Sequence, residues 1–184
     1  RLCDGAAHQG VAAFAAAHEY AEMDDIFALA ESRNESPFIV VCDSLEDPHN
    51  LGAILRSAEA AGVHGVIIPK RNSVTLNYTV AKTSAGAIEY VPVVKVANLP
   101  AAIDELKSRG VWIFGADMDG TDYTALDYSG SIALVIGSEG KGIGRLVREK
   151  CDFIASLPMR GKINSLNASV AAGILMFEAA KHRN

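Results

Sequence analysis

The sequence predicts an α/β domain with a parallel sheet and helices on both of its faces. Apolar runs rich in Val, Ile and Phe recur along the chain, and they are continuous, as in strands that are buried on both faces. Segments with apolar residues at helical spacing lie between these runs. The 184 residues, 49% of them hydrophobic, are enough for one domain with a sizeable core. Strands that alternate with helices in this way are typical of a parallel sheet.

The expected elements follow one another from residue 24 to the end of the chain. Strands are predicted at 38–45, 63–69, 90–96, 111–118, 132–140 and 152–158. Helices are predicted at 24–31, 50–61, 79–87, 99–110, 144–150 and 165–181. The last of these helices carries Leu166, Val170, Ile174 and Phe177 on one face.

A change in composition near residues 31–37 divides the chain. Residues 1–36 carry two basic and seven acidic side chains, which accounts for the whole formal net charge of −5, so residues 37–184 are neutral. We expect residues 1–36 to be a linker or tail and 37–184 to be the main domain. Because the chain begins with Arg1, we expect it to be a piece of a longer protein. Within 137–162, six basic residues stand against three acidic ones, which is compatible with a local phosphate-binding patch.

Several classes of protein lack their signatures in this sequence. No segment approaches the roughly 18 uninterrupted apolar residues of a transmembrane helix, and no signal-peptide pattern is present. Cys3, Cys42 and Cys151 match neither a zinc spacing nor a disulfide framework, and we expect idle thiols in a reducing cytoplasm. The five histidines are scattered, so no metal site is predicted. The chain also lacks the dinucleotide-binding GxGxxG, the P-loop and the GxSxG elbow.

The stretch "DPHNLGAILRSAEAAG", residues 47–62, begins as an ordinary helix and then departs from the pattern. Apolar residues recur at helical spacing from Leu51, and Gly62 stands where a helix commonly ends. Asn50 lies in the opening turn, and Arg56 projects away from the apolar stripe. Arg56 is therefore either an incidental surface arginine or a residue that is presented to a substrate.

Two strand-to-helix loops carry unusual residues, and ligands of open α/β sheets bind beyond the carboxyl ends of strands. "GSEGKGIG" at 137–144 has several glycines, which can let the backbone approach a ligand closely, and one carboxylate, Glu139. "PMRGKINSLNASVAAGI" begins at Pro158, and its Ser165 or Asn167 can cap the last helix. Capping explains one of these two polar residues, but it does not explain why Pro158, Gly161, Ser165 and Asn167 all lie in the same strand-to-helix loop.

These three stretches together carry a resemblance to a known family. "DPHNLGAILRSA", "IGSEGKGI" and "LPMRGKINSLNASVA" resemble, in order, the three motifs of the SpoU/TrmH family of RNA 2′-O-ribose methyltransferases, of the SPOUT class. The resemblance covers residues 37–182. "HQGV" at 8–11 and "TSAGAIEYVPVVKVANL" at 83–99 further resemble the branch that methylates guanosine in large-subunit (23S) ribosomal RNA.

The resemblance implies a fold, a cofactor and partners. The C-terminal third of the domain would form a deep trefoil knot, which is very rare in proteins. The cofactor would be S-adenosylmethionine, and the protein would act as a cytoplasmic homodimer on RNA, with no metal and no membrane. Residues 1–36 would connect to a missing N-terminal RNA-binding domain. Two alternatives stay open, namely methylation of transfer RNA and a non-catalytic RNA-binding relative of the same fold.

The resemblance also implies roles for single residues. Arg56, Asn50 and Glu139 would be catalytic, with Glu139 holding one of the other two in place. The cofactor would be held by the loops that follow the last two strands, through Gly137, Leu157, Met159, Ser165, Leu166 and Asn167. Phosphates of the RNA would bind Lys141, Arg145, Arg160 and Lys162.

Arg56 allows two readings of its chemistry. The family pattern gives it the role of the base that accepts the proton of the ribose 2′-hydroxyl. A guanidinium group is effectively always protonated in proteins, which argues against that role. Alternatively, Arg56 grips the adjacent phosphate with two hydrogen bonds and stabilises the developing alkoxide.

Overall fold

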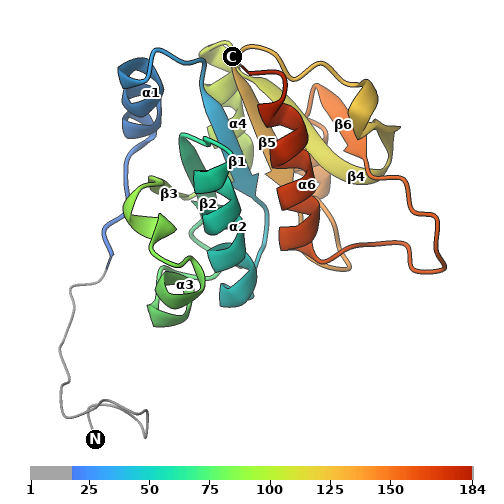
Figure 1. The fold of residues 1–184 in the computed structure, drawn as a ribbon, viewed down its shortest axis with the longest axis horizontal. Helices are drawn as coiled ribbons and strands as arrows, with labels where there is room; N and C mark the ends of the chain where they lie inside the picture. Colours follow the sequence, from blue (N-terminus) through green and yellow to red (C-terminus); the bar gives the residue numbers. More distant parts are fainter. Residues whose placement is uncertain (1–17, 184) are drawn as a thin grey trace, which may run out of the picture.

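The computed structural model describes residues 18–183, and within them a six-stranded parallel sheet forms the centre of the fold (Figure 1). The strand order is β3-β2-β1-β5-β4-β6. The strands are β1 (Phe38–Cys42), β2 (Gly65–Pro69), β3 (Val93–Val96), β4 (Trp112–Asp122), β5 (Ile132–Ile136) and β6 (Phe153–Ser156). Every neighbouring pair is parallel, which confirms the predicted α/β class.

Helices cover both faces of this sheet. The α-helices are α1 (Met23–Ser32), α2 (Pro48–Ala60), α3 (Tyr78–Thr83), α4 (Leu99–Ser108), α5 (Arg145–Arg148) and α6 (Ala168–Ala180), and the 3₁₀ turns are η1 (Ala87–Glu89) and η2 (Tyr123–Ala125). One layer of core contains α2, α3 and α6, and the other contains α1, α4 and α5. Helices α2 and α6 lie side by side in front of the sheet in Figure 1, with α4 behind it.

The central strands have the burial expected of a parallel sheet between two layers. All five residues of β1 and all five of β5 are buried. Their side chains alternate between the layers, since Val40 belongs to the α2 and α6 side and Val41 to the α1 and α4 side. Burial on both faces explains why these strands read as continuous apolar runs in the sequence.

Most predicted ends shift by one to three residues, and the strand expected at 132–140 ends four residues early, at Ile136. Two further elements differ more. The strand expected at 111–118 extends to Asp122, and β4 pairs with β6 on both sides of a register shift between Ala116 and Thr121. The helix expected at 79–87 is two elements, α3 and η1, because Ala85 and Gly86 have positive φ and interrupt it. Both differences come from backbone conformations that apolar periodicity does not report.

The segment that precedes β1 contributes to the core. Met23, Ile26 and Ala30 of α1 are buried, the first two in the core on the α4 side of the sheet. The Ala21 amide donates to the Val93 carbonyl at 2.9 Å. Residues from about 21 onward are therefore packed as part of the folded domain. The "HQGV" stretch at 8–11 and Cys3 lie outside the described residues.

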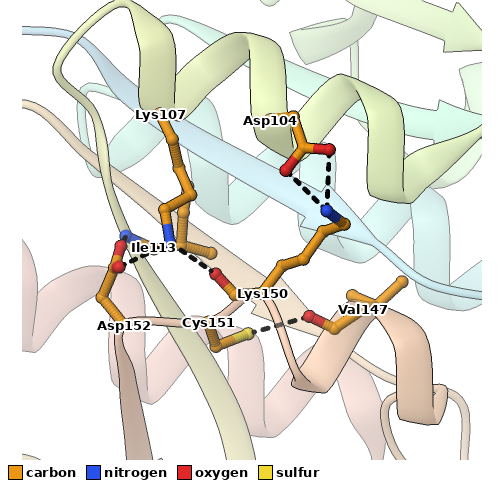
Figure 2. Close-up of polar contacts among 7 residues, drawn as sticks. All are labelled: Asp104, Lys107, Ile113, Val147, Lys150, Cys151 and Asp152. Atoms are coloured by element: carbon orange, nitrogen blue, oxygen red, sulfur yellow. Dashed lines mark hydrogen bonds and ion pairs between the residues drawn. The ribbon is translucent and has the colours of Figure 1, made fainter.

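An ion-pair network fixes the start of β6, the edge strand that leads into the candidate site (Figure 2). Lys107 of α4 donates to the Asp152 carboxylate at 2.7 Å and to the Lys150 carbonyl at 3.1 Å. The other oxygen of Asp152 accepts from the Ile113 amide of β4 at 2.9 Å. Lys150 in turn reaches Asp104 at 2.6 Å. Asp152 thus ties the start of β6 to both β4 and α4.

We predict that Asp152→Ala destabilises the protein more than Asp104→Ala does. The Asp152 side chain is 17% exposed and satisfies a backbone amide, so its loss should lower the free energy of unfolding by about 1–3 kcal/mol. The Asp104 side chain is 59% exposed and holds only Lys150, so its loss should cost at most about 1 kcal/mol. Urea unfolding of both variants measures the difference. Equal losses would contradict the role given to Asp152.

Candidate functional site

A cavity of about 300 Å³ opens where β5 and β6 end, and residues of β4 form another part of its wall. Carboxyl ends of parallel strands are the usual place of ligand sites in such sheets. Its wall is made of Ala116–Met118, Ile136–Gly142, Ala155, Leu157, Met159, Asn164–Leu166, Ala168 and Ala171. The loop 137–144 and the loop that begins at Pro158 therefore line one cavity.

The loop 137–144 is closed by contacts between its own backbone groups. Ser138 and Gly142 exchange backbone hydrogen bonds of 2.9 and 3.2 Å, and Gly140 and Gly142 have positive φ. A Cβ on Gly137 would lie 2.1 Å from the Gly142 carbonyl carbon. The sequence analysis assigned the glycines of this loop to close approach of a ligand. At Gly137 the closest neighbour is instead the loop's own backbone.

Asp43 anchors the far end of the same loop, and sequence reasoning missed it. It follows β1 directly and is only 7% exposed. Its carboxylate accepts from the Gly144 amide at 2.7 Å and from the Ser44 hydroxyl at 3.0 Å. Its one signal in the sequence is an acidic residue placed immediately after a buried apolar strand.

Asn50, Glu139 and Asn167 form one hydrogen-bonded group, and they come from three separate segments. The Glu139 carboxylate oxygen Oε1 accepts from the Asn50 amide at 3.0 Å and from the Asn167 amide at 2.5 Å. Asn167 also donates to the Asn50 side-chain carbonyl at 2.9 Å, and its own carbonyl caps α6 through the Ser169 amide at 3.0 Å. Helix α2, the 137–144 loop and the start of α6 are thus joined through three side chains.

The comparison with protein families agrees with this geometry. The sequence model of the SpoU rRNA Methylase family matches residues 37–177, which include all three segments. The chain belongs to the SpoU rRNA methylase family. The Bacillus subtilis (strain 168) protein YacO, whose name assigns it to the TrmH family of tRNA/rRNA methyltransferases, is 57% identical over 178 residues. That match covers 96% of this chain and 72% of YacO.

Solved structures of SpoU proteins share the fold. AviRb, a SpoU methyltransferase from Streptomyces viridochromogenes in complex with its cofactor AdoMet, matches with a TM-score of 0.75 and 31% identity. The match covers 80% of this chain, which spans 58% of the AviRb chain. A TrmH/SpoU tRNA modifying enzyme from A. aeolicus matches with a TM-score of 0.72 and 29% identity, over 86% of this chain and 82% of that one. The matched proteins thus include enzymes named for transfer RNA and for ribosomal RNA.

The SpoU motif residues named in the sequence analysis fall into three groups. The cavity wall includes Gly137, Glu139, Leu157, Met159, Ser165 and Leu166. Asn50 and Asn167 lie beside the cavity, bonded to Glu139. Arg56 is exposed on α2 and is not part of the cavity wall. Among residues 18–183, no side chain or backbone group makes a hydrogen bond or an ion pair with the Arg56 side chain.

Asp117 and Met118 of β4 form a wall of the cavity that the SpoU motifs do not predict. The Asp117 carboxylate is held by Arg148 of α5, whose Nε donates to it at 2.9 Å. The same guanidinium also donates to Asp119. The extended β4 therefore brings an ion-paired carboxylate to the wall of the cavity.

Within residues 18–183 the site offers neither a reactive thiol nor a metal centre. Burial, followed by the charge of Asp43, raises the pKa of the Cys42 thiol to about 12. Burial also raises the pKa of Cys151 to about 11. Both thiols thus stay protonated near neutral pH, where a thiolate nucleophile is required for thiol chemistry. No group of three or more His, Cys, Asp or Glu that could hold a metal exists among these residues, nor does a helix long and apolar enough to cross a membrane.

Proposed function

We propose that this chain transfers a methyl group from S-adenosylmethionine to a ribose 2′-hydroxyl of RNA, at a guanosine of large-subunit (23S) ribosomal RNA. The observation that carries the proposal is the meeting of the three SpoU segments, through Glu139, at the edge of one cavity. Family membership and the AdoMet complex of AviRb support the choice of cofactor.

The cavity suits S-adenosylmethionine in size and in charge. Small-molecule sites span about 300–1,000 Å³ and are mostly apolar with a few polar groups. Here Leu157, Met159 and Leu166 provide apolar walls, while Asp117 and Glu139 provide carboxylates. These carboxylates can bind the ammonium group of the cofactor, while Lys141 in the same wall can bind its carboxylate. When bound, the cofactor supplies a methyl group on positively charged sulfur, which is open to attack by an oxygen nucleophile.

A guanidinium group is a poor proton acceptor in proteins, so we assign Arg56 to the RNA backbone as a phosphate grip. A two-pronged hydrogen bond to the phosphate next to the target fixes the ribose, and the positive charge stabilises the oxygen as it loses its proton. The exposed position of Arg56 suits a contact with a large substrate. It does not suit a contact with a cofactor inside the cavity of the same chain.

The position of Arg56 supports a homodimer whose active sites are shared between subunits. Helix α6 exposes Val170 (49%), Ile174 (36%) and Phe177 (51%), an apolar stripe that a second copy would cover. Ser57, which follows Arg56, lies beside α6, because its Oγ is 3.8 Å from a Cβ built on Gly173. We propose that each Arg56 serves the cavity of the partner subunit.

The knot and the RNA class complete the proposal. Contacts of Asn167 and Ala168 with the 137–144 loop support a C-terminal segment threaded as in the SPOUT trefoil knot. The 83–99 stretch supports ribosomal over transfer RNA. The tRNA modifying enzyme of A. aeolicus keeps methylation of transfer RNA as the second candidate. A basic rim at Lys141, Arg145, Arg160 and Lys162, all exposed, is available for phosphates.

Calorimetric titration tests the cofactor directly. S-adenosylmethionine and its demethylated product should bind the protein, while NAD and ATP should give no heat of binding, because the chain lacks their loop motifs. RNA transcripts of the large-subunit and transfer classes, incubated with labelled cofactor and digested to nucleosides, then test the reaction. Binding of NAD without S-adenosylmethionine would refute the proposal.

Arg56→Ala and Gly137→Val should separate the RNA role from the cofactor role. Arg56→Ala should leave the affinity for S-adenosylmethionine within a few-fold and lower single-turnover methyl transfer by roughly 10²-fold. Arg56→Lys should recover little, because a point charge does not reproduce a bidentate grip. Gly137→Val should weaken cofactor binding first, since its side chain displaces the Gly142 backbone. If Arg56→Ala transfers the methyl group at nearly the wild-type rate, Arg56 has no role in the reaction.

Mixed dimers test whether Arg56 acts across the interface. Light scattering should show a dimer, and Phe177→Glu should convert it to monomers by placing a charge in the apolar stripe. Arg56→Ala and Glu139→Ala should each transfer methyl groups at a strongly reduced rate when tested alone, roughly 10²-fold lower for Arg56→Ala. Mixed after dissociation, they should recover activity, because one of the two shared sites then has both residues intact. If both residues act within one chain, mixing should recover nothing.

A further inference from the structure

A second cavity, of about 410 Å³, lies on the other side of the 137–144 loop. Its wall is made of Ser44, Leu45, Glu46, Asp47, Asn50, Asn72, Ser138, Glu139 and Lys141. Ser138, Glu139 and Lys141 belong to the walls of both cavities. A ligand in the second cavity is therefore a direct neighbour of the cofactor proposed for the first, with Glu139 between them.

The wall of the second cavity includes carboxylate oxygens that are free to accept hydrogen bonds from a ligand. One oxygen of Asp47 caps α2 through the His49 amide at 2.8 Å, and Oε1 of Glu139 is bonded to the two asparagines. The Glu46 carboxylate is exposed, and within residues 18–183 it makes no hydrogen bond or ion pair. Ionised carboxylates only accept hydrogen bonds, so this cavity suits a ligand rich in N–H donors.

The charge of this cavity argues against a phosphate as its occupant. Three carboxylates stand against one cation, Lys141, so an anion would be repelled. No group of three or more potential metal ligands exists among the described residues, which argues against a bound cation. Lys70 and Arg71 are exposed just before Asn72, and they provide positive charge outside the acidic wall. An RNA chain can thus place its phosphates at this rim and an uncharged base inside.

We propose that the second cavity receives the base of the target nucleotide and that Glu46 selects guanine; the inference rests on the function proposed above. The Watson–Crick edge of guanine presents two adjacent donors, N1–H and the N2 amino group, which match the two oxygens of one carboxylate. Adenine, cytosine and uracil offer a single donor group on that edge. Because Glu139 borders both cavities, a base held by Glu46 leaves its ribose facing the cofactor.

Glu46→Gln tests this assignment, with Glu31→Gln as the matched control. Glu31 is also exposed, but it lies on α1, on the opposite face of the sheet from α2 and α6. The probe is an unmodified large-subunit ribosomal RNA transcript with labelled S-adenosylmethionine, digested to nucleosides. The wild-type product should be 2′-O-methylguanosine. Glu46→Gln should lower kcat/KM about 10- to 100-fold, the range of one lost bidentate base contact.

A base-selecting role makes further demands that a structural role does not. Glu46→Gln should bind the demethylated cofactor within twofold of wild type, and Glu46→Asp, which keeps both acceptors, should regain part of the loss. If Glu46→Gln methylates guanosine with the kcat/KM of the wild type, the inference is overturned and the proposed function stands. A wild-type product on adenosine, cytidine or uridine would also overturn it, with the methyltransferase function intact. Absence of any 2′-O-methylnucleoside from both RNA classes would overturn the proposed function and the inference with it.

Discussion

One carboxylate oxygen, Oε1 of Glu139, joins the parts of the site. It accepts from Asn50 and Asn167 and also from the Ala168 amide at 3.3 Å, so α2, the 137–144 loop and the first turn of α6 share one acceptor. Asn50 is 7% exposed, whereas Glu139 and Asn167 are exposed in the single chain. Water can therefore replace some of these hydrogen bonds until a ligand or a partner subunit covers the three side chains. Covering the site should strengthen these bonds, because hydrogen bonds gain electrostatic strength where water is excluded.

The 137–144 loop can act as a wall between two cavities because it is held at both ends. Gly137 and Gly142 touch through their backbones, and Asp43 holds Gly144 from the end of β1. A loop fixed in this way has little freedom to move toward either ligand alone. Glu139 belongs to the walls of both cavities, so a charge placed in either cavity acts on the same carboxylate. Binding of cofactor and of base would thus be linked through this wall.

The sequence predicted the fold class well because strands buried on both faces leave a strong apolar signal. It predicted the meeting of Asn50, Glu139 and Asn167 only through the family resemblance, since spacing along the chain carries no information on contacts across the sheet. Asp43 was missed for the same reason, as its partner Gly144 is 101 positions away. The extension of β4 depends on pairing with β6 across a register shift, which periodicity does not detect. In the proposed dimer, the groups that Arg56 contacts belong to a second subunit and to the RNA, so they cannot be predicted from the sequence of one chain.

The acidic balance of the chain is compatible with an RNA substrate because the charge is unevenly placed. Of the acidic residues before β1, those on α1 lie on the face shared with α4 and α5. Helices α2 and α6, which carry Arg56 and the apolar stripe, lie on the other face of the sheet. Lys70, Arg71 and Lys141 are exposed at or next to the wall of the second cavity, where they provide local positive charge for an RNA substrate despite the net charge of −5.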